Sequence, residues 1–417
     1  MGAKGIIKKA TPNFLLNLYY EIWPFFGALI YRFPSKSIKV IGVTGTNGKT
    51  TVTHLTTEIF EEAGYKVGSI SSLRFKVGDK ERKNELKMTM PGRMTIQKIL
   101  REAVDVGCEY FILEVTSEGI RQARHKFINF DIAVFTNLTP EHIESHGSFE
   151  NYKRAKGELF KIAKRAVVNL DDENAEYFSE LCRGEVYFYK MKSQSLPQYK
   201  IKEMTKVVSS EDANLSLSLL GEFNLYNALA SVCAGLLEGI SMTIIRRALE
   251  NSKCVPGRME IVLKTPFTVV VDYAHTPDSL RKVYETMLSN YEVRETGGKK
   301  LICVLGSAGG GRDKWKRPEM GKIAQEYCDE IILTDEDPYN ENPDSILNEI
   351  ESGFSKNIKH KRILDRRTAI REAIKSAKTG DTVVITGKGA EPWMMKKEGR
   401  VRWDDRDVAR EEIKKLA

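Results

Sequence analysis

The sequence predicts an α/β protein with a P-loop central domain, built on a mainly parallel, doubly wound sheet, and a C-terminal Rossmann-like α/β domain. Three observations lead to this fold class. Short apolar runs alternate with helical stretches, most of these runs end in polar residues, and one leads through a glycine-bearing loop into a helix. The chain of 417 residues has room for two or three domains. We expect a hydrophobic and basic N-terminal segment (1–37), a central domain (38–254) and a C-terminal domain (255–417).

The central domain begins at Ile38, where the sequence pattern changes. "IKVIGVTG" is typical of a buried strand, and "KTTVTHLTTEIFEEAG" is typical of the helix that follows it. "YFILEVTS", "IAVFTNLT" and "RAVVNLDD" are further apolar strands with polar ends. Ligands bind beyond the carboxyl ends of the strands in such sheets, so we expect these polar ends to converge on one site.

A second α/β set begins after "VPGRME" at residues 255–260. Its strands are expected in "FTVVVDYAHTPDSL", "KLICVLGSAGGGRDK", "EIILTDEDPYN" and "DTVVITGKGAE", which again end in polar residues. The domain boundary is therefore expected near residues 253–257.

The composition indicates a globular protein that does not bind nucleic acid. The net charge of +8 is spread over interspersed acids and bases, without a dense basic stripe with interleaved aromatic residues. The six cysteines form no CxxC pair, which argues against a zinc ribbon: Cys108, Cys182, Cys233, Cys254, Cys303 and Cys328. Their apolar settings predict reduced, buried thiols in a cytosolic protein.

Residues 1–37 stand apart as an aromatic and basic segment. "FLLNLYYEIWPFFGALIY" approaches the ~20 residues of a bilayer-spanning helix, but Asn17, Glu21 and Pro24 interrupt it. No convincing signal-peptide cleavage site follows it. Basic residues flank it at Lys4, Lys8, Lys9, Arg32 and Lys36. Three structures stay open: a helix packed on the main body, a monotopic helix on a membrane surface, and a true span.

"GVTGTNGKTT", residues 42–51, has the parts of a phosphate-binding loop but not the usual GxxxxGK[ST] spacing, because Val43 stands where the first glycine belongs. Lys49 can neutralise phosphate oxygens, and the Thr50 hydroxyl can reach a magnesium ion. Backbone N–H groups of the loop and of the helix start can cradle the phosphates. The expected nucleotide-binding residues of this loop are Gly45, Thr46, Asn47, Gly48, Lys49, Thr50 and Thr51.

Glu114 and His142 are candidate metal ligands. Glu114 ends the strand "YFILE", and His142 follows "FTNLTPEH". Each alone is more often a surface or structural residue. Both follow strands of the P-loop sheet, however, where an acid and an imidazole can hold a divalent ion that bridges phosphates.

Several motifs, in order and across both domains, resemble the ATP-dependent Mur ligases. They are "VTGTNGKTT", "EVTS", "TNLTPEHIESHGSFENYKRAKGELF", "GEFNLYNALA", "PGRME" and "DYAHTPDSL". "GGGRDKWKRPEMG" and "WDDRDVAR" resemble the branch that makes UDP-N-acetylmuramyl tripeptides. The unusual P-loop spacing is this family's version.

The resemblance implies an ATP- and Mg²⁺-dependent ligase, ADP-forming, that works as a monomer in peptidoglycan precursor synthesis in the cytoplasm. In that family a substrate carboxylate becomes an acyl phosphate, and an amine then displaces phosphate to form an amide. Lys156 in "NYKRAKGELF" matches a lysine that is carbamylated in the family, so that it can ligate a second magnesium ion. An ordinary surface lysine is the alternative.

The resemblance also implies further ATP contacts. Asn224 and Asn227 in "GEFNLYNAL" lie three apart on one helix face, although Asn224 equally suits a helix cap. Arg258 at the domain junction would reach phosphate as the domains close. Asp272 and His275 would contact the ribose and base, with loop packing as the alternative for His275.

The acceptor side is expected in "MTMPG", residues 88–92, where Thr89 matches the family's loop for the muramyl dipeptide. Thr116 and Ser117 keep the hydroxyls that follow the strand acid, but Glu118 replaces the family's histidine. A cationic cluster in "GGGRDKWKRP" suits an anion, with a solvated charge run as the alternative. Its members are Arg312, Lys316 and Arg317.

The added amino acid is expected to meet "DEDPYNENP" and "GKGAEPW". Family members that add meso-diaminopimelate carry Asp-Asn-Pro-Arg, and here Tyr339 stands in the place of that arginine. Tyrosine cannot make arginine's bidentate clamp on a carboxylate. Asp337 and its acidic neighbours would instead attract an ammonium, and Glu391 would receive the amino group. This favours lysine, ornithine or another diamino acid.

Only 37 residues precede the P-loop strand, where the family has a uridine-binding domain of roughly a hundred residues. We therefore expect that domain to be missing, and the acceptor to be either UDP-linked or lipid-linked, with peripheral membrane contact through residues 1–37. A folylpolyglutamate-like ligase and a nucleotide-binding scaffold without ligase activity stay as alternatives. An amidating partner of a glutaminase is disfavoured because that branch has a four-cysteine zinc element.

Overall fold

The computed structural model describes residues 13–86, 88–191, 206–289, 299–355 and 358–416. By packing, the chain divides into two compact units. The first comprises Met1–Leu138, Glu150–Ser216 and Leu225–Asn251, and the second comprises Thr139–Phe149, Leu217–Asn224 and Ser252–Ala417. Two short segments that the sequence assigned to the central domain, Thr139–Phe149 and Leu217–Asn224, thus pack with the second unit.

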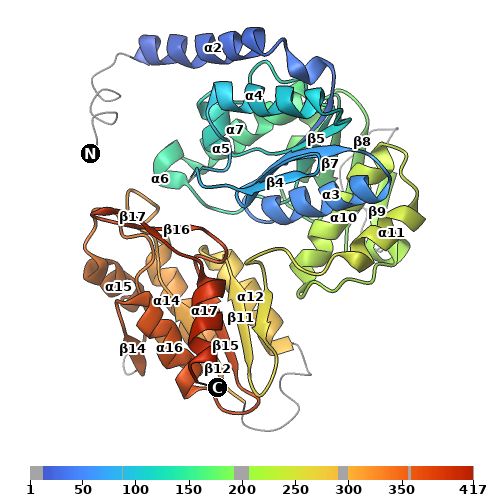
Figure 1. Ribbon diagram of the computed structural model, residues 1–417. Coiled ribbons are helices and arrows are strands. Elements are labelled where there is room, and N and C mark those ends of the chain that lie inside the picture. Colours follow the sequence, from blue (N-terminus) through green and yellow to red (C-terminus); the bar gives the residue numbers. More distant parts are fainter. Residues whose placement is uncertain (1–12, 87, 192–205, 290–298, 356–357, 417) are drawn as a thin grey trace. The chain divides into compact units, whose positions relative to one another are not determined.

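The first unit alternates strands and helices, as predicted (Figure 1). Its strands are β1 (Lys39–Thr44), β2 (Val67–Ile70), β3 (Arg74–Val77), β4 (Lys80–Lys83), β5 (Tyr110–Glu114), β6 (Ile132–Phe135), β7 (Arg165–Asn169), β8 (Val186–Lys190) and β9 (Lys206–Ser209). Its helices are α2 (Asn13–Ile30), η1 (Pro34–Lys36), α3 (Lys49–Glu62), α4 (Arg93–Asp105), α5 (Ser117–Arg121), α7 (Phe149–Ile162), α8 (Ala175–Leu181), α9 (Ser210–Ala213), α10 (Glu222–Leu237) and α11 (Met242–Asn251).

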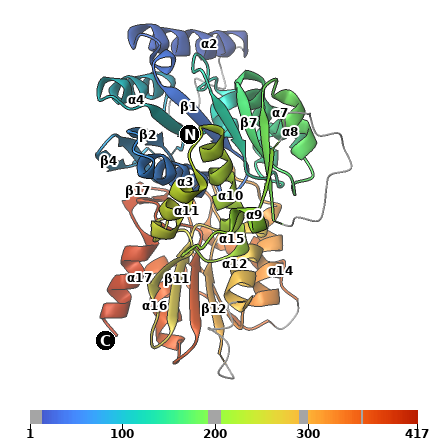
Figure 2. The same cartoon turned by 90° about the vertical axis from the view of Figure 1, so that its right-hand side faces the viewer.

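These strands form one mixed sheet in the order β4-β3-β2-β5-β1-β6-β7-β8-β9, seen with its strands side by side in Figure 2. All pairs from β2 to β9 are parallel, and β3 and β4 add an antiparallel edge. β1 lies in the middle because its apolar, β-branched residues suit burial on both faces. The P-loop and the ends of β5 and β6 therefore lie next to one another at one edge of the sheet.

The second unit holds a smaller sheet in the order β10-β11-β15-β12-β13-β14, parallel except for β10, and a separate hairpin of β16 and β17. Its strands are β10 (Glu260–Leu263), β11 (Thr268–Asp272), β12 (Leu301–Leu305), β13 (Glu330–Leu333), β14 (His360–Arg362), β15 (Thr382–Thr386), β16 (Trp393–Lys396) and β17 (Gly399–Arg402). Its helices are α6 (Ile143–His146), α12 (Pro277–Ser289), α14 (Lys316–Tyr327), α15 (Pro343–Glu351), α16 (Arg366–Ser376) and α17 (Asp405–Lys414). The predicted mixed α/β class with mainly parallel sheets is confirmed.

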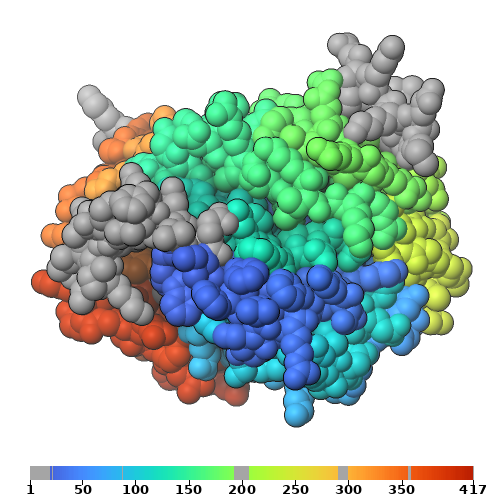
Figure 3. Space-filling view, turned by 90° about the horizontal axis from the view of Figure 1, so that it is seen from above, coloured from blue at the N-terminus to red at the C-terminus, as the bar shows by residue number. Residues whose placement is uncertain are grey.

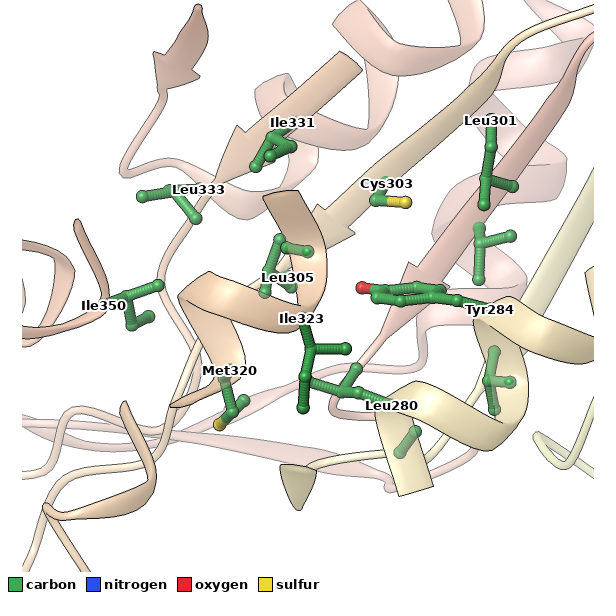
Figure 4. Packing of buried hydrophobic residues seen from close by; sticks show 14 of the residues in the cluster. Leu280, Tyr284, Leu301, Cys303, Leu305, Met320, Ile323, Ile331, Leu333 and Ile350 are labelled. Carbon is green, nitrogen blue, oxygen red and sulfur yellow. The ribbon is translucent and has the colours of Figure 1, made fainter. Parts of the chain in front are cut away.

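The core between this sheet and α12, α14 and α15 contains Leu280, Tyr284, Cys303 and Ile323 (Figure 4). Cys303 forms a disulfide with Cys328, at the end of α14. The prediction that all six cysteines are reduced is therefore wrong for this pair, and Cys254 is exposed rather than buried. Cys108, Cys182 and Cys233 are buried and form no disulfide, as expected.

The N-terminal segment forms helix α2, which packs along α4 (Figure 1). The helix runs through Pro24. Lys4, Lys8 and Lys9 lie outside the described residues. Within the described part of the chain, no helix is long and apolar enough to cross a membrane.

Candidate active site

The loop between β1 and α3 can form only because two of its positions are glycine. Gly45 has φ +151°, and a Cβ there would lie 1.9 Å from Oγ1 of Thr136. Gly48 has φ +83°, and a Cβ there would lie 2.2 Å from Oδ1 of Asn227. Since a non-glycine residue is strained at positive φ and has no room here, the loop is fixed in shape.

The end of β6 holds the loop in place. The backbone N–H of Asn47 donates to Oδ1 of Asn137 (2.9 Å), and the carbonyl of Asn47 accepts from Oγ1 of Thr136 (2.6 Å). The hydroxyls of Thr46 and Tyr152 are 3.1 Å apart. Sequence reasoning missed Thr136, Asn137 and Tyr152. The polar end of "FTNLT" was a signal for the first two, whereas nothing local marked Tyr152.

Two lysines converge on the carbonyl oxygen of Gly45. Nζ of Lys49 donates to Gly45 O (3.0 Å) and to Thr46 O (2.6 Å), and Nζ of Lys156, on α7, donates to Gly45 O (2.6 Å). Lys156 is fully buried and lies 4.5 Å from the ring centroid of Tyr152. Burial, and then the charge of Lys49, hold the pKa of Lys156 well below its usual range, although Glu114 opposes them. Lys156 is thus an interior amine and not a surface lysine.

Thr50 and Glu114, both predicted metal ligands, are in direct contact. Oγ1 of Thr50 donates to Oε2 of Glu114 (3.0 Å), and the same oxygen accepts the backbone N–H of Ser72 (2.9 Å). Oγ of Ser72 lies 2.8 Å from Oγ1 of Thr50. This set of hydroxyl and carboxylate oxygens suits Mg²⁺, which takes few protein ligands and completes its shell with water and phosphate. Sequence reasoning missed Ser72.

His142, the other predicted metal ligand, lies in the second unit with φ +58° at the start of α6. The described residues contain no group of three or more His, Cys, Asp or Glu side chains that could hold a metal ion. The metal roles of His142 and of a carbamylated Lys156 therefore stay predictions.

The acceptor loop, residues 88–92, is held from two sides. Nδ2 of Asn84 donates to the carbonyl of Met88 (3.2 Å), and Nη1 of Arg124 donates to the carbonyl of Met90. Thr89 is half-buried between them. Sequence reasoning missed Arg124, which lies after α5 and contacts this loop only in the fold.

Thr116 caps α5, because its Oγ1 accepts the backbone N–H of Gly119 (3.1 Å). Ser117 is buried in the first turn of this helix. Glu118, in the place of the family's histidine, is exposed and accepts from Nε2 of Gln122 (2.5 Å).

In the second unit, Asp272 ends β11 and accepts the backbone N–H groups of Met259 (2.7 Å) and Ala274 (2.6 Å). Burial raises the pKa of Asp272, and Arg258 opposes this shift. The guanidinium of Arg258 lies 4.1 Å from the ring centroid of Tyr273. Nδ1 of His275 lies 2.9 Å from the carbonyl of Tyr273, and burial holds the pKa of this histidine well below its usual range.

Asn224, predicted to bind ATP, lies in the first turn of α10 and donates from Nδ2 to the carbonyl of Leu220 (2.7 Å). An N-cap side chain accepts a backbone N–H instead, so this contact is not the capping alternative, and the ATP role of Asn224 stays a prediction. Asn227 belongs to the first unit, where it lies against Gly48 of the P-loop.

The predicted cationic cluster is largely neutralised by carboxylates. Nζ of Lys316 lies 3.1 Å from Glu141, and both side chains are buried. Nη1 of Arg317 lies 3.0 Å from Glu341 and 2.7 Å from Glu349. Arg312 is exposed.

The residues expected to meet the amino acid surround a buried lysine that sequence reasoning missed. Nζ of Lys388 lies 3.0 Å from Asp337 and also pairs with Glu391, whose Oε1 accepts the hydroxyl of Tyr273 (2.9 Å). Burial lowers the pKa of Lys388, but these two carboxylates outweigh it and raise the pKa overall. The backbone N–H of Tyr339 donates to the carbonyl of Met395 (3.2 Å).

Glu336 lies beside this group and is fully buried, with Oε2 lacking a hydrogen-bond partner. Burial raises the pKa of Glu336 to about 7, although Arg366 and Lys388 oppose it.

A phosphate-binding loop backed by Lys49 and by the Thr50–Glu114 pair defines a P-loop protein that handles nucleotides. Comparison with known proteins shows which P-loop family the chain resembles. The family model of the Mur ligase middle domain matches residues 43–235, and that of the Mur ligase glutamate ligase domain matches residues 257–389.

Two relatives are UDP-N-acetylmuramoyl-L-alanyl-D-glutamate–2,6-diaminopimelate ligases. The protein of Syntrophomonas wolfei is 40% identical over 398 residues, covering 91% of this chain and 79% of the relative. The protein of Clostridium botulinum is 38% identical over 396 residues, covering 93% of this chain and 80% of the relative. A solved structure of a ligase with this name is 28% identical with a TM-score of 0.58, covering 91% of this chain and 79% of that chain. The chain belongs to the Mur ligase family of enzymes.

Proposed function

We propose that the protein uses ATP to join one amino acid, a diamino acid, to a muramyl-dipeptide-type carboxylate in peptidoglycan precursor synthesis. The relatives named above, which add 2,6-diaminopimelate, support the reaction class. The observation that carries the proposal is the fully buried amine of Lys156 on the carbonyl of the P-loop residue Gly45. A nucleotide-binding scaffold without chemistry has no need for a fully buried lysine amine at this place.

The chemistry requires activation of the acceptor, because an amine does not displace oxide from a carboxylate. A carboxylate oxygen attacks the γ-phosphorus of ATP, ADP leaves, and an acyl phosphate results. The amine of the incoming amino acid then attacks the acyl carbon, loses a proton, and expels inorganic phosphate. Lys49 and the N–H groups at the start of α3 would stabilise the negative charge that develops on the β- and γ-phosphates.

Mg²⁺ would be held by Thr50 and Glu114 and would neutralise phosphate charge. The low pKa of Lys156 keeps a fraction of its amine neutral and able to react with CO₂. This reaction forms an N–C bond, releases a proton and leaves a carbamate. The carbamate of Lys156 would be an anion, whereas the protonated lysine is a cation. An anion suits a position close to Mg²⁺.

The amino acid would meet the ends of β13 and β15, where Asp337, Lys388 and Glu391 lie together. Tyr339 offers no charged clamp for a distal carboxylate. Asp335 lies on the same segment, and a carboxylate there favours an ammonium. We therefore propose lysine, ornithine or a similar diamino acid ahead of meso-diaminopimelate.

We place the reaction in the cytoplasm, where ATP is available, and propose that a monomer suffices, since Lys49, Glu114 and Lys156 come from one chain. Membrane contact through residues 1–37 is part of this proposal.

The test is phosphate release from ATP with Mg²⁺, bicarbonate and UDP-muramyl dipeptide, against a panel of amino acids, with the product mass determined. We expect release to depend on both acceptor and a diamino acid, and the product to be heavier by one residue. Lys49→Ala is the inactive control. ATP turnover with no mass increase for any amino acid would overturn the proposed acceptor.

A further inference from the structure

From Ile22 to Ile30, helix α2 exposes its large apolar side chains and buries its small ones. Pro24, Gly27 and Ala28 are buried. The outer strip is exposed by 39% to 58% and consists of Ile22, Trp23, Phe25, Phe26, Leu29 and Ile30. Together with Tyr19, this one helix carries seven of the sixteen exposed large apolar side chains among the described residues. An apolar surface of this density marks an interaction site.

The packing of α2 on α4 fixes which face is exposed. A Cβ on Gly27 would lie 3.3 Å from Cα of Met94 and 3.4 Å from Cγ of Gln97. At Gly27 the two helices therefore approach so closely that a larger residue does not fit. The helix cannot turn its aromatic residues inward without separating from α4. In Figure 3 the side chains of α2, in dark blue, form an uncovered part of the surface.

The charges around α2 point to an anionic bilayer as the partner. Arg32 and Lys36 are exposed just beyond its end, and residues 1–37 contain five basic residues and one acid, Glu21. Exposed Trp and Phe beside basic residues are typical of helices that lie in the membrane interface. Each basic residue near an anionic leaflet strengthens binding by roughly fivefold.

Two arginines next to the acceptor loop, Arg93 and Arg124, carry guanidinium donors that lack a hydrogen-bond partner. The guanidinium of Arg93, the first residue of α4, lies 5.2 Å from the ring centroid of Tyr19 and 4.4 Å from that of Tyr20. Nε and Nη2 of Arg93 and Nε of Arg124 are buried without a hydrogen-bond partner. Buried guanidinium donors are normally satisfied, so an anionic group is expected to reach them.

We propose that α2 docks the protein on an anionic lipid bilayer through its outer strip, and that Arg93 binds a phosphate group presented at that surface. The apolar strip would contact the acyl region of a lipid, and the guanidinium of Arg93 would bind its phosphate. Both therefore fit the same chemical class, an amphiphile with a phosphate head group. The phosphate comes from a phospholipid head group or from a lipid-linked acceptor. The second source rests on the proposed ligase reaction, whereas docking through α2 does not.

The first experiment measures co-sedimentation of the full chain with vesicles of phosphatidylcholine alone and of phosphatidylcholine with phosphatidylglycerol. We expect tighter binding to the anionic vesicles, by about tenfold or more. The double variant Trp23→Ser/Phe26→Ser should weaken binding roughly 100-fold. The matched control is Ile162→Ser/Val401→Ser, whose parent residues are 45% and 46% exposed on other elements.

Equal vesicle binding by the chain and by the Trp23→Ser/Phe26→Ser variant would overturn docking through α2, as would absence of vesicle binding. A dimer in solution that this variant dissociates would show that a second copy covers the strip, which also overturns the proposal. These outcomes leave the proposed ligase activity on a soluble UDP-linked acceptor untouched, so the two failures are distinguishable.

The second experiment tests Arg93 with two probes: farnesyl diphosphate in phosphatidylcholine vesicles, and phosphatidylglycerol vesicles without it. Arg93→Met should lose tenfold or more in affinity for one probe, and Arg93→Lys, which keeps the charge, should lose less. Loss on farnesyl diphosphate assigns the phosphate to a lipid-linked substrate, and loss on phosphatidylglycerol assigns it to the head group. No loss on either probe, with circular dichroism unchanged, would overturn the role of Arg93.

Discussion

At the scale of single residues, burial decides the chemistry of Lys156. The same side chain on the surface of α7 would be an ordinary cation. Here it is enclosed beside Tyr152, with Lys49 close by, and its pKa falls well below the usual range. The motif "NYKRAKGELF" pointed to this lysine, but only the fold shows that it reaches Gly45.

Replacing Lys156 should therefore abolish activity whether or not a positive charge is kept. Arginine stays protonated and cannot form a carbamate. We expect Lys156→Ala and Lys156→Arg each to lower acceptor-dependent phosphate release by roughly 100-fold or more. Lys153→Arg, on the same helix, should retain activity. Phosphate release by the wild type should also be slower in CO₂-free buffer, because the carbamate cannot form there. Full activity of Lys156→Arg would contradict the assigned role.

Glu336 gives the second unit a pH-dependent stability. Its pKa is about 7 in the folded protein and about 4.5 when exposed. The folded state thus holds the proton more tightly. Its contribution to stability is complete below about pH 4.5 and is lost as the pH rises through 7, by roughly 3 kcal/mol.

Glu336→Gln should remove this loss. Relative to the wild type, we expect the variant to gain up to about 3 kcal/mol in unfolding free energy between pH 5 and pH 8. Urea unfolding followed by tryptophan fluorescence measures it, because Trp315, Trp393 and Trp403 lie in the second unit. Glu398→Gln, at an exposed site, is the control. The same pH dependence in Glu336→Gln and wild type would show that Glu336 does not titrate in this range.

Residue partners that lie far apart in sequence could not be predicted. Lys316 and Arg317 read as an anion-binding cluster, yet their carboxylate partners Glu141, Glu341 and Glu349 come from other segments. The Cys303–Cys328 disulfide was missed for the same reason, since its two cysteines meet only when α14 packs on β12. Local sequence shows the charge and spacing of side chains. It does not show which side chains from distant segments come into contact.

At the scale of elements, the strand–loop–helix unit of β1 and α3 was predictable because its signals are local. An apolar, β-branched run, two glycines and a helical stretch follow one another in 24 residues, from Lys39 to Glu62. The short β3–β4 edge was not predicted, because "KERK" in β4 has neither apolar residues nor alternation.

Gly45→Ala should damage this unit selectively. An added Cβ would collide with Oγ1 of Thr136, and φ +151° is unfavourable for alanine. We expect a loss of roughly 1–3 kcal/mol in stability and loss of ADP binding by calorimetry. Gly64→Ala is the matched control, since Gly64 has φ +88° but no atom within 4 Å of its Cβ position. ADP binding by Gly45→Ala at wild-type affinity would show that the loop shape is not required.

At the scale of the whole molecule, the order of apolar runs with polar ends was enough to predict two successive α/β units. It could not show that Thr139–Phe149 and Leu217–Asn224 pack with the second unit. Those segments carry His142 and Asn224, so the metal role of His142 and the ATP contact of Asn224 stay predictions. The pattern of apolar residues predicts which residues are buried in a strand. It does not predict which of the two units a connecting segment packs against.

The central claim is that ATP phosphorylates the acceptor carboxylate before the amide forms. The most direct measurement labels both oxygens of that carboxylate with ¹⁸O and follows the label by mass spectrometry during ligation of the amino acid. The proposed chemistry predicts one ¹⁸O in each released phosphate and the other in the new amide. Unlabelled phosphate, released at the rate of ADP formation, would show that water and not the acceptor receives the phosphoryl group, and would contradict ligation through an acyl phosphate.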